Sequence, residues 1–411
     1  MNTRRVVITG IGAVTPLGLS MAETWAGLLA GKSGCGPITR FDTGAMPVKV
    51  ACEVKGFTPE TYMDARSARR SDLFEQYAVG AAVQALRDAE LVILPELAPV
   101  TGVVVGSAVG GFDTMLRQAE LLRERGQRAL SPFCIPMIIT NGATAAVSIH
   151  VGAHGPSFSP VSACATGNDS IGQAAELIRR GAATIMLAGG ADAPVSSFGI
   201  ASFDQLGAVS HIGRPRPFDK ARDGVVIGEG ACVLVLEDLE FALARGARIL
   251  AELVGYGQTT DGSHPIAPVQ TGEHAARAMS LALAQAGVAP AEIGYVNAHG
   301  TATPLNDTSE TAAIKLALGD AARSVPISST KSMTGHMMGA TAALEAAICV
   351  MAIRDGMIPP TMNLTNPDPL CDLDYTPNTA RAARVDVAVN NAFGFGGHNS
   401  VTVIRKFVDH G

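Results

Sequence analysis

The chain has 411 residues, enough for roughly two or three ordinary domains or for one large α/β unit. Its residues are 47% hydrophobic and only 17% charged, so we expect part of its surface to be covered in a subunit interface, with a homodimer as the first expectation. The net charge of −6 argues against nucleic acid as a partner, and no segment approaches the roughly 18 continuous apolar residues of a membrane span.

The N-terminus runs directly into a predicted strand at residues 6–10. No long apolar signal region precedes it, which indicates a cytoplasmic protein. The seven cysteines are scattered and contain no C-x-x-C pair, so we expect neither a disulfide framework nor a metal site. Gly10 and Gly12 match part of a dinucleotide-binding fingerprint, but its third glycine and its later acidic residue are missing. We interpret this segment as a tight turn.

Three arginines, Arg66, Arg69 and Arg70, stand at i, i+3 and i+4, so they share one face if their segment is a helix. We call them the arginine patch. In an acidic chain a local basic patch suits the docking of an acidic protein. An ordinary solvated helix explains it equally well, because arginines are surface residues by default.

Cys164 is the most informative position. A strand-like run ends at Val161, small residues follow, and residues 168–180 are predicted to be a helix. The cysteine would face the free N–H groups and the positive end of that helix, where a thiolate is stabilised. A thiolate attacks acyl groups. Alone, this cysteine would more simply be a buried structural residue.

Two histidines further along the chain favour the catalytic interpretation. His299 ends a strand-like run, and His336 follows a predicted strand and a tight loop at the start of a helix. Side chains at such positions can point into a site. A Gly-rich segment, residues 390–399, closes the series.

The chain also resembles itself. Two pairs of segments have the same offset along the chain: 162–167 with 330–335, and 223–236 with 391–404. Two weaker pairs are 6–10 with 253–257 and 103–106 with 295–299. A shared offset is hard to ascribe to chance, so we interpret the chain as two duplicated βαβαβ-type halves, the first enlarged by insertions.

The two halves are residues 1–250 and 251–411. Alternating strands and helices predict an α/β fold with mainly parallel sheets and active groups at the carboxyl ends of strands. Cys164 belongs to the first half and both histidines to the second. We therefore expect the site where the halves meet.

In this order, the motifs resemble those of the β-ketoacyl-[acyl carrier protein] synthases of the thiolase superfamily, and among them the elongating type II enzymes of fatty-acid synthesis. The similarity runs from Arg5 to the last strand, essentially the whole chain. It implies a thiolase-like fold whose two halves form a layered α/β/α/β/α core.

The resemblance also implies decarboxylative condensation of an acyl chain with malonyl-[acyl carrier protein]. Cys164 would take the acyl chain from the carrier protein's phosphopantetheine, with no other cofactor. His299 and His336, as neutral imidazoles, would donate hydrogen bonds to the enolate that forms when malonyl loses CO2. The backbone N–H groups of Cys164 and Phe395 would hold the tetrahedral oxyanion.

Supporting roles follow from the same resemblance. Lys331 and Glu310 would form a salt bridge that fixes the histidine loops, with Lys331 an organiser and not a proton carrier. Phe395 would act as a gate between the nucleophile and the malonyl side. Gly394 and Gly396 would let the backbone approach the reacting carbon.

Substrate contacts are implied for five further residues. Thr301 and Thr303 match threonines that bind the pantetheine arm, although capping and turn formation is their simpler role. Val109, Phe203 and Met137 match regions that border the acyl pocket, although apolar residues there are mostly core. The arginine patch would receive the acyl carrier protein.

Two departures from the family pattern lie around the entrance of the site. Ile266 stands where type II enzymes commonly have another threonine, and the segment 209–218 is shorter than usual. Both bear on carrier docking and substrate preference and leave the condensation chemistry unaffected.

Alternative functions remain open at this point. One is the ketosynthase (alpha) subunit of a type II polyketide or polyene pathway, which pairs with a nonidentical partner. Another is a non-condensing partner subunit, which Cys164 and the two histidines argue against. A redox-sensing role for Cys164 is weaker, because no resolving cysteine stands near it in the sequence.

Overall fold

The computed structural model describes residues 4–408. Within that range, nine strands form one hydrogen-bonded sheet in the order β4-β5-β6-β1-β7-β13-β12-β8-β9. Their bounds, in that order, are Thr101–Gly106, Ile185–Asp192, Gly230–Asp238, Val6–Val14, Ala251–Thr260, His398–Arg405, Val387–Gly394, Tyr295–Asn297 and Ile327–Ser328. Two short hairpins complete the strands: β2 (Gly36–Pro37) with β3 (Val50–Ala51), and β10 (Met357–Ile358) with β11 (Arg381–Ala382).

The helices of the first half are α1 (Met21–Leu29), α2 (Ala65–Ala68), α3 (Leu73–Asp88), α4 (Phe112–Arg125), α5 (Cys134–Ile138), α6 (Gly142–Val151), α7 (Thr166–Arg179), α8 (Ser197–Gln205) and α9 (Leu239–Ala244). Those of the second are α10 (Glu273–Ala286), α11 (Pro304–Leu318), α12 (Lys331–Thr334) and α13 (Gly339–Asp355). None of the helices formed by residues 4–408 combines the length and the apolar character needed to cross a membrane.

The strand order is symmetrical about the junction of β1 and β7. Moving outward from it, β6 corresponds to β13, β5 to β12 and β4 to β8. The repeated segments of the sequence fall on corresponding strands, since 6–10 lies in β1 and 253–257 in β7. Duplication explains this symmetry, and we propose that the halves divide near residue 250, between α9 and β7.

The prediction of mainly parallel sheets is wrong. Only the β4–β5, β12–β8 and β8–β9 ladders of this sheet are parallel, and the other five are antiparallel. A parallel neighbour needs a crossover that packs back along the sheet. After β5 the chain passes through α8, which packs on α4 instead, and then enters β6 in the opposite direction.

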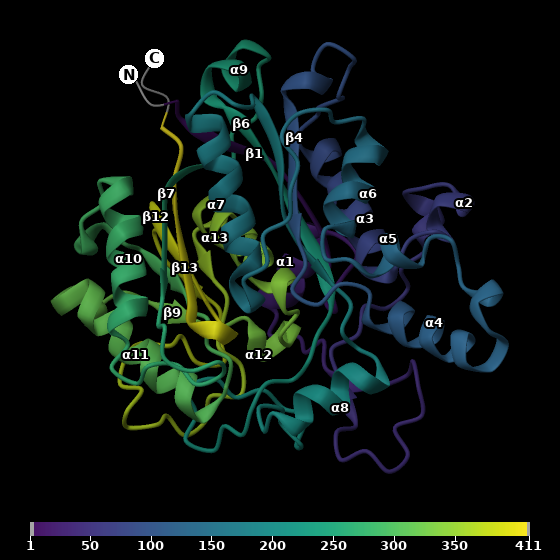
Figure 1. Cartoon of the computed structure of the whole chain (residues 1–411). Coiled ribbons are helices and arrows are strands. Elements are labelled where there is room, and N and C mark those ends of the chain that lie inside the picture. The colour runs from purple at the N-terminus through teal and green to yellow at the C-terminus, as the bar shows by residue number, and fades with distance from the viewer. Residues whose placement is uncertain (1–3, 409–411) are drawn as a thin grey trace.

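Helices α7 and α13 lie in the centre of the molecule, between the two halves of the sheet (Figure 1). Each contacts strands of both halves. Helices α3 and α6 cover the outer face of the first half, and α10 covers that of the second. Every residue of α13 from Gly339 to Ile353 is buried, as expected for a helix that is mostly apolar on all sides. These layers confirm the α/β/α/β/α arrangement.

Candidate active site

Cys164 lies in a single 3₁₀ turn, Ala163–Ala165, that leads directly into α7. The helix begins at Thr166, two residues earlier than predicted, and residues 158–161 form no strand. The Ser162 N–H donates to the Thr166 hydroxyl at 3.0 Å, which closes the turn. Ala163 has φ of 51°, a left-handed conformation that residues other than glycine rarely adopt. Such strain just before a nucleophile is typical of an active site.

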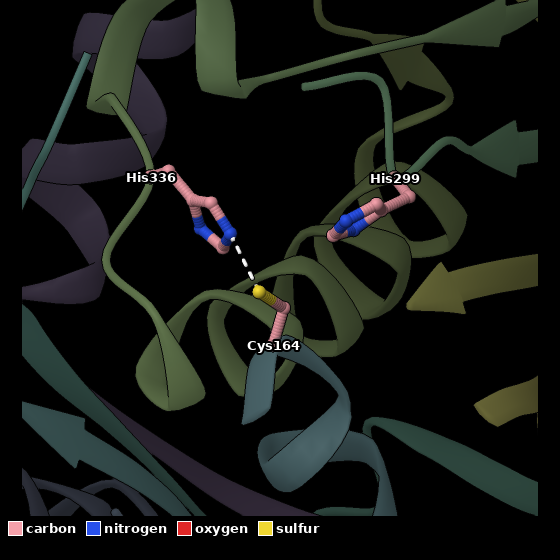
Figure 2. A group of neighbouring side chains, drawn as sticks. All are labelled: Cys164, His299 and His336. Atoms are coloured by element: carbon pink, nitrogen blue, oxygen red, sulfur yellow. Dashed lines mark hydrogen bonds between the residues drawn. The ribbon is translucent and has the colours of Figure 1, made fainter. Parts of the chain in front are cut away.

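His336 contacts the cysteine directly. Its Nε2 lies 3.0 Å from Cys164 Sγ, and its Nδ1 lies 3.0 Å from the Thr341 hydroxyl (Figure 2). The histidine follows α12, and its backbone N–H donates to the Val226 carbonyl at 2.7 Å. Thr341, in the first turns of α13, therefore orients the imidazole toward the sulfur.

The second histidine, His299, follows β8 and lies across the site from His336 (Figure 2). The two ring centroids are 5.7 Å apart, with the planes at 83°. Glu310 accepts the backbone N–H groups of His299 and Gly300 at 2.8 and 2.7 Å, which fixes this loop. His299 Nδ1 is buried without a partner among the described residues.

Burial raises the pKa of Cys164 to about 11, although Lys331 and the backbone N–H of Phe395 both act to lower it. The prediction of a stabilised thiolate is therefore wrong for the resting site, because loss of water around the sulfur outweighs the favourable helix end. The cysteine rests as a thiol. Its proton must pass to a base, and His336 is in hydrogen-bonding contact.

Both histidines are neutral near pH 7. Burial, with the positive charge of Lys331, lowers the pKa of His336 to about 3. Burial, Lys331 and the neighbouring His336 hold the pKa of His299 well below its usual value. A neutral imidazole can accept a proton at one nitrogen and donate a hydrogen bond from the other.

Lys331 pairs with Glu345, so the predicted salt bridge to Glu310 is wrong. Its Nζ donates to Glu345 Oε1 at 2.7 Å, and the two side chains are 2% and 1% exposed. Glu310 is instead occupied by backbone N–H groups and by the amide of Asn391 at 3.2 Å. The partner is different because α13 passes behind the site and places its one buried carboxylate beside Lys331.

The Gly-rich segment lies against the nucleophile. A Cβ at Gly394 would stand 2.8 Å from the Ser162 carbonyl oxygen and 3.0 Å from the Cys164 nitrogen, so this approach requires glycine. Gly396 has φ of 82°, the left-handed region that glycine adopts without strain. The backbone N–H groups of Phe395 and Cys164 both act to lower the pKa of the Cys164 sulfur, so both lie beside the reacting atom, where an oxyanion-binding pair is needed.

A pocket opens onto these groups. Several predicted site residues line it: Cys164, His299, His336, Thr301, Thr303, Phe203, Phe395, Ile266 and Gly394. The hydroxyls of Thr301 and Thr303 are 2.9 Å apart and face this space. An apolar pocket with a few polar groups is the usual form of a ligand site.

Val109 and Met137 do not line this pocket. The Val109 N–H donates to Asp192 at 3.2 Å, and Met137, on α5, borders a separate surface groove beside Arg69. Their place in the acyl pocket stays a prediction.

The arginine patch is exposed, but its helix is shorter than the spacing suggested. Helix α2 ends at Ala68, so Arg69 and Arg70 continue in a turn. The guanidinium of Arg70 lies 4.4 Å from the centre of the Phe133 ring. The patch is therefore free to meet a partner, with one member partly engaged.

Sequence reasoning missed three residues that hold the site together: Thr341, Glu345 and Asp192. Asp192, at the end of β5, accepts the N–H groups of Ala108 at 3.0 Å and of Gly339, the first residue of α13, at 2.7 Å. Burial raises its pKa to about 6. A signal existed for Glu345, which is a lone carboxylate inside an otherwise apolar helix.

The ligand atoms of Cys164, His299 and His336 all lie within 4.8 Å of one another. Within residues 4–408 this is the only cluster of three such side chains. Thiolate and imidazole are ligands that suit zinc, so the trio could hold such an ion after modest movement. The hydrogen bond between Cys164 and His336 shows that the same atoms already form a proton-transfer pair.

Comparison with known families bears directly on this geometry. The model of the β-ketoacyl synthase N-terminal domain matches residues 3–242, and that of the C-terminal domain matches residues 250–365. The chain belongs to the β-ketoacyl synthase family. A 3-oxoacyl-[acyl-carrier-protein] synthase 2 of Synechocystis sp. is 46% identical to it, over 99% of each chain.

Solved structures of β-ketoacyl synthases share the fold. The ishigamide ketosynthase/chain length factor is 40% identical, with a TM-score of 0.93 over 99% of this chain and 100% of that one. A type II polyketide ketosynthase bound to the hexaketide, in complex with its acyl-carrier protein, is 34% identical. Its TM-score is 0.90 over 99% of this chain and 100% of that one.

Proposed function

We propose that this β-ketoacyl synthase is a 3-oxoacyl-[acyl carrier protein] synthase that elongates fatty acids. The observation that carries the proposal is the Cys164–His336 contact of 3.0 Å with His299 facing the same sulfur. One cysteine and two neutral imidazoles supply a nucleophile and two hydrogen-bond donors, which is what decarboxylative condensation needs. The similarity to a synthase 2 over 99% of both chains supports it.

In the first half-reaction, Cys164 attacks the thioester carbonyl of the acyl carrier protein. Its proton passes to His336 Nε2 as the S–C bond forms. The oxyanion is held by the N–H groups of Cys164 and Phe395. The carrier's thiolate then leaves and takes up the proton.

In the second half-reaction, malonyl-[acyl carrier protein] loses CO2, and the electrons of the broken C–C bond form an enolate. His299 donates a hydrogen bond to its oxygen, and His336 does the same once its remaining proton has moved from Nδ1 to Nε2. The enolate carbon attacks the acyl group on Cys164. The new C–C bond forms, the C–S bond breaks, and the 3-oxoacyl product remains on the carrier protein. The Cys164 thiolate that is released takes up one proton from water, which restores the resting thiol.

Replacing the nucleophile tests this sequence. Cys164→Ala should abolish condensation, and intact-mass measurement of the parent after incubation with acyl-[acyl carrier protein] should place the acyl adduct on Cys164. An adduct on another cysteine would refute the assignment.

The histidine variants separate the half-reactions. His299→Ala and His336→Ala should still permit acylation of Cys164 to differing degrees, more slowly in His336→Ala because the base that takes the thiol proton is lost. In both variants malonyl decarboxylation should fall roughly 10²–10³-fold, the usual effect of losing one oxyanion donor. Near-normal CO2 release from both variants would give the histidines another role.

We further propose that substrates arrive only on the phosphopantetheine of an acyl carrier protein, without another cofactor, and that the enzyme acts in the cytoplasm as a homodimer. The exposed arginine patch in a chain of net charge −6 supports docking of an acidic carrier. A related ketosynthase is known in complex with its acyl-carrier protein.

A second candidate function is favoured by one observation, the 40% identity to a ketosynthase that pairs with a chain length factor. In that case the chain would be the ketosynthase subunit of a polyketide pathway. Expression alone distinguishes the two: a stable, active homodimer supports fatty-acid elongation, whereas activity only with a nonidentical subunit supports the alternative.

A further inference from the structure

Two cysteines outside the active site face each other across the β2–β3 hairpin. Gly36 pairs with Ala51 and Pro37 with Val50, so one more step in this antiparallel register places Cys35 opposite Cys52. The Ile38 N–H donates to the Lys49 carbonyl at 3.0 Å, which makes that pair hydrogen-bonded.

Hydrogen-bonded and non-hydrogen-bonded residue pairs alternate along an antiparallel ladder. Cys35 and Cys52 are three pairs away from Ile38 and Lys49, so they form a non-hydrogen-bonded pair, whose Cα atoms are about 4.5 Å apart. Disulfides need Cα separations of about 4.4–6.8 Å. The backbone therefore already holds the two cysteines within bonding range, at the short end.

The two thiols have different environments. A hydrogen bond from the Cys52 side chain lowers the pKa of Cys35, with a further contribution from Lys55. Burial raises the pKa of Cys52 well above its usual value. Cys35 is half-buried and Cys52 is buried. The accessible thiol is thus also the more acidic one, as in pairs of an attacking and a resolving cysteine.

The buried cysteine lies behind the catalytic histidine. A Cβ at Gly335 would stand 2.7 Å from Cys52 Sγ, so the sulfur packs on the residue just before His336. The Cys52 N–H donates to the Ile227 carbonyl at 2.8 Å. Gly228, which follows Ile227, donates its own N–H to the His336 carbonyl, also at 2.8 Å. Movement of Cys52 would therefore displace the backbone of His336.

We propose that Cys35 and Cys52 form a reversible disulfide by exchange with a small aliphatic disulfide, and that this bond lowers the reactivity of Cys164 by displacing the His336 loop. The Cys35 thiolate attacks one sulfur of the small disulfide and releases one small thiol. Cys52 then gives up its proton and attacks Cys35, releasing the second. Two protein thiols become one disulfide while one small disulfide becomes two thiols, and excess small thiol reverses both steps.

Peptide mapping tests the bond. Protein carrying Cys164→Ala is treated with oxidised glutathione, the remaining thiols are blocked, and trypsin is added. We expect peptide 33–40 joined to peptide 50–55, with the link lost under dithiothreitol. Cys52→Ala should instead retain glutathione on Cys35, because no thiol remains to resolve it. Cys134→Ser, which removes another half-buried cysteine, should leave the link intact.

A stable glutathione adduct on Cys35 when Cys52 is present, or no reaction at Cys35, would overturn the proposed bond. Both outcomes are independent of condensation, so they leave the proposed function untouched.

The coupling to His336 has its own measurement. After the same oxidation, iodoacetamide should alkylate Cys164 roughly 2–30-fold more slowly than in the reduced protein, the range typical of coupling between sites. Cys35→Ser, a substitution at a half-buried position, should show no change on oxidation. Equal rates in oxidised and reduced parent protein, with the bond present, would overturn the coupling.

Discussion

At the scale of single residues, the resting state of Cys164 is decided by burial. With its pKa raised to about 11, only a small fraction of the sulfur is thiolate near pH 7. Alkylation of Cys164 by iodoacetamide should therefore rise roughly tenfold per pH unit from pH 7 through pH 9, because the thiolate is the reacting form. The rate is measured on the peptide that carries Cys164. A plateau near pH 7 would mean a preformed thiolate.

The buried Lys331–Glu345 pair leads to a second prediction at this scale. Glu345→Ala should lower the free energy of unfolding by roughly 3–5 kcal/mol, because it leaves a buried ammonium without its partner. Urea unfolding measures the change. The double variant Lys331→Met with Glu345→Met should recover most of the loss, since a buried pair can be replaced by apolar side chains. A small change in the free energy of unfolding for Glu345→Ala would indicate that Glu310 is the main partner of Lys331.

At the scale of elements, the turn between β12 and β13 carries the proposed gate. Phe395 is half-buried, lines the pocket with Cys164, and is followed by Gly396 and Gly397, both at positive φ. Glycines of this kind give a loop freedom to move, and loops often control entry of a second substrate. Phe395→Ala should therefore release more CO2 from malonyl per molecule of condensation product.

The ratio of CO2 to 3-oxoacyl product measures the effect. If the ring is only packed core, its truncation should cost roughly 3–5 kcal/mol of stability. A lower melting temperature with an unchanged ratio of CO2 to product would contradict a gating role for Phe395.

The arginine patch belongs to the same scale, as one turn of helix and the residues after it. Arg66, Arg69 and Arg70 changed together to Glu should raise the KM for acyl-[acyl carrier protein] and weaken its salt dependence, because the patch attracts an acidic partner. Turnover of an acyl-pantetheine surrogate should hardly change. Equal losses on both substrates would assign the patch to folding.

At the scale of the whole molecule, exposed apolar side chains gather on neighbouring elements of the first half. Ile135 on α5 is 62% exposed, Ile149 on α6 is 83% exposed, and Val161 is 52% exposed. Val161 follows Ser157, which pairs with Val103 of the edge strand β4. Helices α5 and α6 contact each other. Exposed apolar side chains grouped on neighbouring elements are typical of a protein interface, and they support the proposed homodimer.

Ile149→Lys should convert that dimer to a monomer, because it introduces a charge into an interface while hardly affecting the isolated fold. Light scattering after size exclusion measures the mass. Leu316→Lys is the matched control, since Leu316 is 61% exposed on α11 in the other half. A dimer that survives Ile149→Lys would place the interface elsewhere.

The sequence by itself determined the chemistry of the site. Cys164, His299 and His336 stand in turns at the ends of strands or before helices, and these local signals depend on neighbouring residues only. The internal repeat predicted the meeting of two halves, which the symmetrical strand order supports.

Only the tertiary structure decided strand direction, the partner of Lys331 and the protonation of Cys164. Each depends on atoms distant in sequence: the path of the chain through α8, the passage of α13 behind the site, and the exclusion of water from the sulfur. Local patterns record which residues a turn or helix favours. Pairing and desolvation are properties of the packed molecule, because they are set by what surrounds a group once the layers close around it.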